Sequence, residues 1–177
     1  SGASLMSNPY LDADGQYRPL EMSDAALASP AYAAARRSWA ATNAGDRDAW
    51  IAGWNPEGTI EDPVGPSMFD AEGLGHTGTE RLLEFWEKAV ATPDHIEFRF
   101  DRGIAAGDEL LCVGTMRTHM GSSIMEIDIA VDYRVDSQGR LVNLRAFWEQ
   151  DVTMASGLRP LTDDDRAAIA GAAGKSE

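Results

Sequence analysis

Asp62 is the residue whose type and setting most favour chemistry in this chain. It follows the short extended segment 59–61 and comes directly before Pro63, with Gly65 two residues further on. Proline has no N–H for a strand ladder and biases the residue before it towards an extended conformation, so Asp62 is expected at the end of a strand. A carboxylate fixed there, between tryptophans and apolar strands, could serve as the general base of a hydrophobic pocket. The alternative is a turn in which Asp62 bonds to its own backbone, and the four residues alone favour this turn.

The other reactive residue types are scattered along the chain. His76 is expected on a loop, His95 after a helix and His119 facing outward from a strand, so these histidines do not predict a metal site. Only His76 is placed where it could reach Asp62 as a proton carrier, and an exposed loop histidine is the simpler interpretation. The single cysteine, Cys112, lies in an apolar segment and is expected to be a core residue. The sequence has no glycine-rich phosphate loop, and we expect neither a metal nor a cofactor.

Two helices are predicted ahead of Asp62. The first begins with Ser29 as N-cap and Pro30 at the first helical position, and it ends at Gly45. A second, short helix follows and carries Trp50 and Trp54 on one side. Both helices would place aromatic side chains close to the segment that ends in Asp62.

A third helix is predicted from a capping box at residues 77–80 to the proline at position 93. The loop before it, residues 66–76, is rich in glycine and polar residues. This loop is long enough to act as a flap over a pocket, or it is a tolerated insertion.

After residue 93 the hydrophobic period changes from that of a helix to two. Strands are predicted over 96–101, 109–120, 125–133 and 142–148, each with one apolar face. Three helices followed by an antiparallel meander indicate an α+β protein in which the sheet wraps over the helices. The opposite sheet face is polar and is expected to be solvated or to pair with a second sheet; it carries Arg117, His119, Glu126, Asp128, Asp132 and Arg145.

The length and composition indicate one domain. A chain of 177 residues with 44% hydrophobic and 25% charged residues suits a single globular core. We expect an irregular arm over residues 1–28, the domain over 29–155 and a tail over 156–177 that holds one weak helix. The residues before Met6 are expected to be a tag remnant ahead of a native start.

The charge balance excludes some partners. The chain has 29 acidic and 15 basic side chains and a net charge of −14, which repels phosphate backbones and anionic lipid. We therefore expect no nucleic-acid partner and no membrane partner. No apolar run approaches the roughly 20 residues of a membrane span, and no signal-peptide pattern opens the sequence, so the expected compartment is the cytoplasm.

Four blocks of the sequence, in order and spacing, resemble bacterial ketosteroid isomerase. They are Asn43-Ala-Gly-Asp46, Thr59-Ile-Glu-Asp-Pro-Val-Gly65, Gly78-Thr-Glu-Arg-Leu-Leu-Glu-Phe-Trp86 and Tyr133-Arg-Val-Asp-Ser-Gln-Gly-Arg-Leu-Val-Asn-Leu-Arg-Ala-Phe-Trp148. The likeness covers about residues 30–152 and is strongest to mycobacterial steroid-isomerase-like members. It implies a cone-shaped α+β barrel of the nuclear transport factor 2-like (SnoaL-like) superfamily, with three N-terminal helices packed in a curved, mostly antiparallel sheet. It also implies a homodimer formed through the outer sheet face.

The resemblance carries only part of the family's site onto this chain. The general base of the family falls on Asp62 and its pocket tryptophan on Trp148. Its two oxyanion donors do not carry over, because the tyrosine position falls on Ser38 and the neutral-acid position on Val131; the neighbouring Asp132 faces the other way. Losing one such donor typically costs about 2.7–4 kcal/mol of transition-state stabilisation. Replacement donors are conceivable, and each also has a structural role to play: the indoles of Trp39 and Trp148 and the hydroxyls of Tyr32, Ser38, Thr118 and Tyr133.

Three hypotheses for the function follow. The first is an enzyme that binds a hydrophobic, ring-containing molecule of steroid size and uses Asp62 to move a proton at a carbon next to a carbonyl. The second is a cofactor-free dehydratase, retro-aldol lyase or cyclase on an aromatic or polyketide substrate, and the third is a non-catalytic steroid-binding protein. Burial should raise the pKa of Asp62 above its reference value of about 3.9. The expected pocket residues are Tyr32, Ser38, Trp39, Trp54, His76, Met116, Thr118, Met125, Ile127, Ile129, Val131, Tyr133, Leu144 and Trp148.

Overall fold

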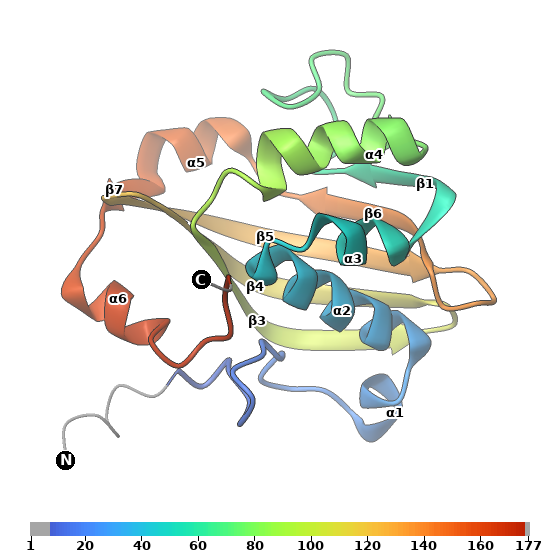
Figure 1. Ribbon diagram of the computed structural model, residues 1–177, viewed down its shortest axis with the longest axis horizontal. Coiled ribbons are helices and arrows are strands. Elements are labelled where there is room, and N and C mark those ends of the chain that lie inside the picture. The colour runs from blue at the N-terminus through green and yellow to red at the C-terminus, as the bar shows by residue number, and fades with distance from the viewer. Residues whose placement is uncertain (1–7, 176–177) are drawn as a thin grey trace.

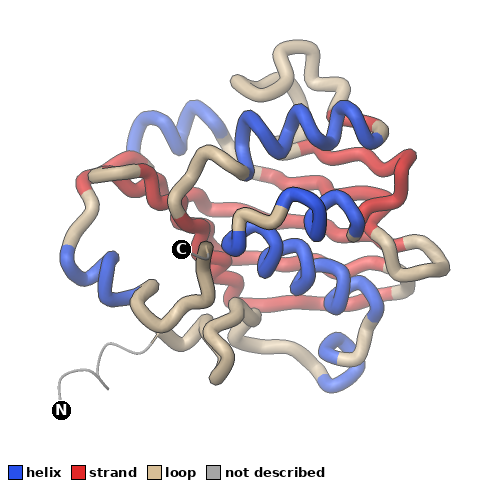
Figure 2. The backbone as a smooth tube through the Cα atoms, in the orientation of Figure 1, coloured by secondary structure: helices blue, strands red, loops and turns tan. Residues whose placement is uncertain are grey.

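The helices pack inside the curve of a twisted sheet in the computed structural model, which describes residues 8–175 (Figures 1 and 2). The helical segments are α1 (Asp24–Leu27), α2 (Pro30–Ala44), α3 (Arg47–Ala52), α4 (Thr79–Phe85), the π-helix η2 (Trp86–Val90), α5 (Gln150–Ser156) and α6 (Asp163–Ala168). The strands are β1 (Trp54–Glu61), β2 (His76–Thr77), β3 (His95–Ala106), β4 (Glu109–Met120), β5 (Ser123–Val135), β6 (Leu141–Phe147) and β7 (Leu158–Pro160).

The sheet is mostly antiparallel, as predicted. Its strand order is β2-β1-β6-β5-β4-β3, and β7 pairs with β5. The exception is the β1–β6 pair, which runs parallel with Ile60 opposite Leu144. This parallel pair matters for the site, because β1 and β6 run in the same direction and their C-terminal ends lie side by side. The α+β class and the curved sheet around N-terminal helices are confirmed.

Helix α2 has the ends that the sequence predicts. The Ser29 hydroxyl accepts a hydrogen bond from the Tyr32 N–H at 3.2 Å, Pro30 stands at the first helical position, and Gly45 ends the helix with φ of 66°. A left-handed C-cap suits glycine because it has no Cβ to clash. The inner side of α2 is buried, and the Trp39 ring stacks on Phe98 of β3 at 5.5 Å between centroids.

The next two predicted helices differ from the prediction at their ends. The second helix ends at Ala52, and Trp54 is the first residue of β1. The third begins after Gly78 without a side-chain cap, so the predicted capping box is wrong. The reason is that Thr77 belongs to β2, where its hydroxyl lies 2.8 Å from that of Thr59. After Phe85 the helix widens into the π-helix η2, a feature that is often found at functional sites.

One part of the outer face of β3 and β4 is buried, although the face was expected to be solvated or to pair with a second sheet. Glu97 is fully buried there, with one carboxylate oxygen 2.9 Å from His119 Nε2 and the other 3.1 Å from Arg99 Nη1. His119 is 3% exposed, so the prediction that it faces outward is wrong. Beside it, His95 Nε2 lies 2.7 Å from the Tyr17 hydroxyl. Residues of the N-terminal arm therefore cover a polar cluster that the sequence places in water.

The arm and the tail lie next to each other beneath the sheet (Figure 1). The Ala173 N–H donates to the Gly15 carbonyl at 2.9 Å, and the arm contains the one-turn helix α1. The weak helix predicted in the tail is α6, which has a Thr162–Asp165 capping box and an Asp165–Arg159 ion pair. Met6 lies outside the described residues. The homodimer through the outer sheet face stays a prediction; the arm covers part of that face at Glu97, where the Asn8 amide reaches the carboxylate, while Leu111 and Val113 of β4 are exposed.

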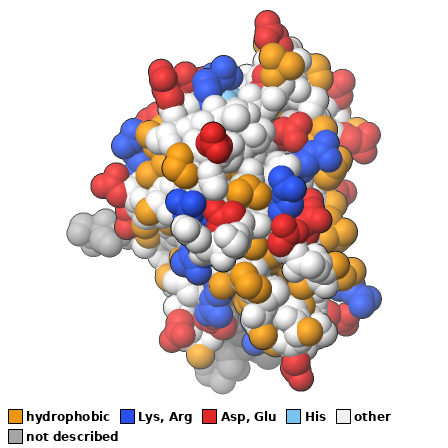
Figure 3. Space-filling model, turned by 90° about the vertical axis from the view of Figure 1, so that its right-hand side faces the viewer, with side chains coloured by type: hydrophobic (Ala, Val, Ile, Leu, Met, Phe, Trp, Pro, Cys, Tyr) orange, Lys and Arg blue, Asp and Glu red, His pale blue; other side chains and the backbone are white. Residues whose placement is uncertain are grey.

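Two properties bear on partners. Within residues 8–175 no helix combines the length and the apolar character needed to cross a membrane. On the face shown in Figure 3, acidic and basic side chains are interspersed with hydrophobic ones and form no continuous basic patch.

Candidate functional site

Asp62 is positioned by the parallel pair of strands. Strand β1 ends at Glu61, which faces Arg145 of β6 and pairs with its side chain at 2.8 Å. The next residue, Asp62, points to the other side, where one carboxylate oxygen accepts a hydrogen bond from Trp148 Nε1 at 2.7 Å. Trp148 directly follows β6, so the parallel register brings the two residues together. The carboxylate thus bonds to an indole rather than to the backbone of a turn.

The surroundings of Asp62 favour its protonated form. Burial raises the pKa of Asp62 to about 6, and the hydrogen bond from the Trp148 indole opposes this rise. An indole N–H is neutral and compensates only part of the desolvation of a carboxylate. A carboxylate with a pKa close to neutrality accepts a proton more readily than an ordinary aspartate and is still largely ionised at pH 7.

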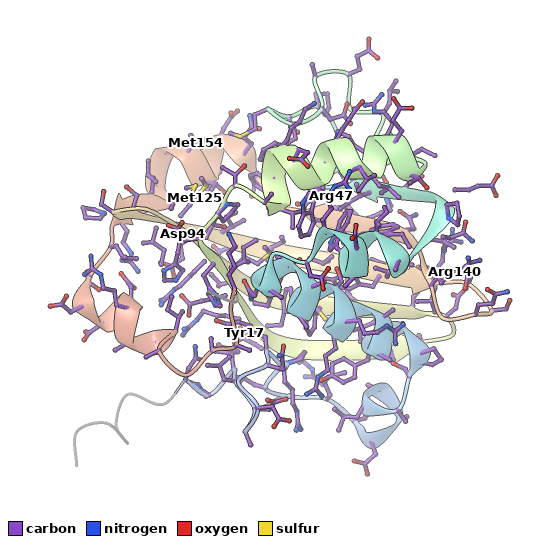
Figure 4. The ribbon with its side chains drawn as sticks, viewed as in Figure 1. Tyr17, Arg47, Asp94, Met125, Arg140 and Met154 are labelled. Carbon is purple, nitrogen blue, oxygen red and sulfur yellow. The ribbon has the colours of Figure 1, made fainter. Side chains whose placement is uncertain are left out.

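A cavity of about 280 Å³ opens in front of Asp62, between the helices and the inner face of the sheet. This volume is just below the range of typical small-molecule sites, roughly 300–1,000 Å³. Met125 of β5 lies beside α5 on the wall of the cavity (Figure 4). Most of the side chains expected in the pocket line it: Ser38, Trp39, Asp62, Met116, Thr118, Met125, Ile127, Ile129, Val131, Tyr133, Leu144 and Trp148.

Three expected pocket residues lie elsewhere. Tyr32, in the first turn of α2, is buried against the edge of Trp39. Trp54 begins β1, at the opposite end of the strand from Asp62, and packs on Trp50. His76 is 2% exposed in β2 and packs on Phe85, so the prediction of a mobile loop histidine is wrong. Burial lowers the pKa of His76, and its backbone pairs with Ile60 of β1, so His76 belongs to the packed sheet and does not line the cavity.

The cavity also has walls that the sequence reasoning missed. The alternation in β3 gave a signal for Ile96 and Phe98, which share the inner face. Nothing in the sequence signalled the π-helix. The additional lining residues are Thr42, Trp50, Ile60, Met68, Phe69, Phe85, Lys88, Ala89, Val90, Thr92, Pro93, Ile96, Phe98 and Met120.

The loop between β1 and β2 forms part of the cover of the cavity. Met68 and Phe69 line the cavity, and the Phe69 ring meets the edge of Phe85 at 6.0 Å. The Asp70 carboxylate holds the loop in shape by accepting from the Gly75 N–H at 2.6 Å, and the Met68 N–H donates to Gln150 Oε1 at 2.7 Å. The loop is therefore attached to α4 and to α5. Its movement as a flap stays a prediction.

A second polar pair, Trp39 and Tyr133, lies within the apolar lining of the cavity. Trp39 Nε1 donates to the Tyr133 hydroxyl at 2.9 Å, and both residues are 3% exposed. Burial raises the pKa of Tyr133 well above 10, and the nearby Cys112 thiol and Asp62 carboxylate add to the rise. Tyr133 is thus a neutral phenol at any physiological pH. Among residues 8–175, no three His, Cys, Asp or Glu side chains gather in a way that could hold a metal ion.

Comparison with known proteins gives one family and several structures. Residues 35–148 match the SnoaL-like domain. The structure is similar to Rv0760c from Mycobacterium tuberculosis, with 26% identity, coverage of 75% of this chain and 97% of that chain, and a TM-score of 0.66. Rv0760c in complex with estradiol-17β-hemisuccinate matches at 25% identity over 74% of this chain and 98% of that chain, with a TM-score of 0.62.

Two enzymes share the fold at lower identity. The Δ5-3-ketosteroid isomerase from a Mycobacterium species is 24% identical, covers 75% of this chain and 99% of its own, and has a TM-score of 0.66. An epoxide hydrolase from M. tuberculosis is 19% identical over 71% of this chain and 87% of that chain, with a TM-score of 0.58. No protein of curated function matches the sequence.

Proposed function

We propose that this chain, which belongs to the SnoaL-like domain family, binds a hydrophobic, ring-containing small molecule and uses Asp62 to transfer a proton at a carbon next to a carbonyl. The observation that carries the proposal is the setting of Asp62. Its carboxylate faces an apolar cavity, holds a single hydrogen bond from a neutral indole, and has a pKa raised to about 6.

The reaction would proceed through an enolate. Asp62 takes a proton from the carbon next to the carbonyl, the C–H electron pair forms a carbon–carbon double bond, and the carbonyl π pair moves to oxygen. The protonated Asp62 then returns the proton to another carbon of the conjugated system, which isomerises the double bond. Trp148 holds one carboxylate oxygen and leaves the other free to face the substrate. No group is consumed, so Asp62 serves again in the next turnover.

The cavity supports a steroid-like or similar ring-containing substrate. Its walls are apolar side chains of five strands, β1, β3, β4, β5 and β6, together with aromatic residues of α2 and α3. Four methionines line it and could adapt to ligands of different shape: Met68, Met116, Met120 and Met125. The complex of Rv0760c with a steroid ester is consistent with this choice.

A second candidate is a cofactor-free dehydratase, retro-aldol lyase or cyclase acting on an aromatic or polyketide substrate. The observation that favours it is the lack of the expected oxyanion donors. Ser38 and Val131 line the cavity at the positions where the resemblance implies a tyrosine and a neutral acid. Such reactions place developing charge elsewhere on the substrate. A binding protein without catalysis is the third candidate.

The test is an assay with a Δ5-3-ketosteroid that follows the ultraviolet absorbance of the conjugated Δ4 product. Loss of the base in Asp62→Asn should lower kcat by about 10²–10⁴-fold, because general base catalysis contributes a factor of this size. Steroid affinity, read from tryptophan fluorescence, should change only a few-fold. Glu61→Gln is the matched control, since this neighbouring carboxylate pairs with Arg145 away from the cavity.

The outcomes separate the three candidates. Turnover that survives in Asp62→Asn would exclude both enzymatic candidates as drawn. A wild-type protein that binds the steroid tightly without turnover would instead point to another reaction or to a carrier, and aromatic and polyketide ketones would be tested next.

A further inference from the structure

We infer that Tyr133 is the hydrogen-bond donor to the substrate oxygen in the Asp62 cavity, with Trp39 as the residue that positions and polarises its hydroxyl. The inference rests on the proposed function and adds a catalytic residue to it. It assigns to Tyr133 the stabilisation of the enolate oxygen, a role that the residues at positions 38 and 131 leave open.

The position of Tyr133 follows from the pleat of β5. Residues alternate across a strand, so Ile129, Val131 and Tyr133 share the inner face and all line the cavity. Tyr133 stands opposite Leu110 of β4 and Leu144 of β6, two apolar neighbours that fix its ring between them. Its ring meets Trp39 edge-on at 6.0 Å. The hydroxyl is therefore held in place by a packed wall instead of a loop.

The Tyr133 hydroxyl accepts a hydrogen bond, and its own proton is left without an acceptor among the described residues. The hydroxyl oxygen accepts the Trp39 indole N–H at 2.9 Å. An indole only donates, so Trp39 cannot take the phenolic proton in return. Among residues 8–175, no group accepts a hydrogen bond from the Tyr133 hydroxyl. A buried donor without an acceptor is costly, and a substrate carbonyl in the cavity would satisfy it.

The electrostatics keep this donor protonated and make it stronger when charge develops. Burial raises the pKa of Tyr133, so the phenol does not ionise at the pH at which Asp62 is a base. When the substrate oxygen becomes negative, the phenol polarises towards it, and the Trp39 N–H stabilises the charge that this leaves on the phenol oxygen. Hydrogen bonds in such a chain strengthen one another in a dry site.

The other polar residues of the cavity wall are weaker candidates. Ser38, Thr42 and Thr118 carry aliphatic hydroxyls, which are less acidic than a phenol. Lys88 lines the cavity from η2 but is exposed to water. Only Tyr133 combines an acidic O–H, full burial and a partner that fixes its oxygen.

The reaction balances with Tyr133 as a donor that keeps its proton. Asp62 takes the proton from carbon, the carbonyl oxygen gains the π electron pair, and the Tyr133 O–H shortens its hydrogen bond to that oxygen. When the enolate collapses, the proton on Asp62 passes to carbon and the hydrogen bond lengthens again. No oxidant, reductant or second reactant is needed.

The first test compares Tyr133→Phe with Tyr17→Phe. Both variants remove a buried phenol hydroxyl, but Tyr17 belongs to the arm, its hydroxyl lies 2.7 Å from His95 Nε2 of β3, and it does not line the cavity. Tyr133→Phe should lower kcat by about 10²–10³-fold with a small change in KM, as expected for an oxyanion donor. Tyr17→Phe should keep kcat within a few-fold. An unchanged kcat in Tyr133→Phe, with turnover intact in the wild type, would overturn the inference and leave Asp62 in its role.

The second test needs no turnover. A series of substituted 2-naphthols of increasing acidity would be titrated into the protein, because an ionising phenol oxygen resembles an enolate. In the wild type, affinity should rise with naphthol acidity; in Tyr133→Phe this slope should be lost, and in Trp39→Phe it should be reduced. An unchanged slope in both variants would overturn the inference. Loss of the slope in a protein that isomerises no ketone would support the donor and reject the isomerase proposal.

The third test asks whether Trp39 acts on the reaction only through Tyr133. If Trp39 acts only through the phenol, the double variant Trp39→Phe/Tyr133→Phe should have the same kcat as Tyr133→Phe alone. Additive losses would show that Trp39 acts separately, and they would contradict its assignment as a positioning residue. Should Tyr133→Phe fail to fold, which circular dichroism would reveal, the reduced naphthol slope of Trp39→Phe decides the question.

Discussion

Two carboxylates of this protein, the half-buried Asp62 and the fully buried Glu97, have opposite surroundings on opposite sides of the same sheet. Burial acts on both in the same direction and would raise the pKa of each. At Glu97 the hydrogen bonds from His119 and Arg99, together with the charge of Arg99, outweigh burial and hold the pKa below its usual value. At Asp62 only the neutral indole of Trp148 opposes burial, and the pKa rises to about 6.

The difference shows that the two faces of the sheet hold carboxylates with different roles: Glu97 stabilises the fold, and Asp62 is placed to react. Glu97 has three hydrogen-bonding partners, counting the amide of Asn8 at 3.5 Å, and faces no cavity. Its ionised form is satisfied, so it holds the arm and the strands together. Asp62 faces a cavity with one carboxylate oxygen bonded to Trp148 and the other free of hydrogen bonds from residues 8–175. A carboxylate left partly unsatisfied is poised for proton transfer, and stability has to come from elsewhere in the molecule.

The largest effect on stability is expected from removing the charge of Glu97. Glu97→Gln leaves Arg99 and the buried His119 without a charged partner, so the free energy of unfolding at pH 7 should fall by roughly 2–4 kcal/mol. Urea unfolding followed by circular dichroism measures this. The variant should keep its kcat per folded molecule. Glu126→Gln is the control, because its half-exposed pair with Arg117 should contribute less than about 1 kcal/mol.

The pH dependence of that loss has a definite sign. The pKa of Glu97 is lowered in the folded protein, so its stabilisation is present above its ordinary pKa of 4.5 and disappears as the pH falls through the lowered value. The difference between wild type and Glu97→Gln should therefore shrink in acid. A constant difference from pH 7 down to pH 3 would mean that shape, not charge, explains the loss.

The opposite behaviour is expected at Asp62. Its folded pKa is raised from 3.8 to about 6, so its contribution to stability is complete below about 3.8 and is lost as the pH rises through 6. Asp62→Asn, which cannot ionise, should be equal to the wild type near pH 4 and more stable at pH 7, by up to about 3 kcal/mol. Thermal unfolding at pH 4, 5, 6 and 7 measures this gain. A variant that is less stable at pH 7 would show that the ionised carboxylate is well compensated, as Glu97 is.

The sequence predicts correctly those features that neighbouring residues determine. It fails where segments that are distant in sequence pack on each other. The caps of α2 and the alternation of Met125, Ile127 and Ile129 are properties of neighbouring residues, and both were predicted correctly. The alternation also predicted an exposed His119, because it identifies which residues share a face and not what covers that face. The covering residue, Tyr17, lies more than 70 positions away in sequence from its partner His95.

The same limit explains the errors around the cavity. Strand β2 has two residues, and only its pairing with β1 turns His76 from a loop residue into a buried one. The π-helix η2 arises inside a segment with ordinary helix-forming residues, so no sequence pattern marks it. By contrast, Asp62 was predicted because Pro63 ends the strand at the residue itself.

The smallest and most specific effect concerns the loop that covers Asp62. Phe69 lines the cavity and packs on Phe85, so Phe69→Ala should admit water to the carboxylate. Water reduces the desolvation that raises the pKa of Asp62, so the lower pKa of the kcat/KM profile should fall from about 6 towards 3.8, by roughly half a unit to one unit. Activity against a Δ5-3-ketosteroid between pH 4 and 8 measures this shift.

The matched control for that shift is Leu74→Ala. Leu74 is on the same loop, is 74% exposed, and does not line the cavity, so its removal should leave the pH profile unchanged. If both variants shift the profile alike, the loop acts through its overall order. If neither does, the apolar walls from the sheet and the helices keep Asp62 dry without help from the loop. A shift in Phe69→Ala alone would show that one aromatic ring maintains part of the difference between Asp62 and Glu97.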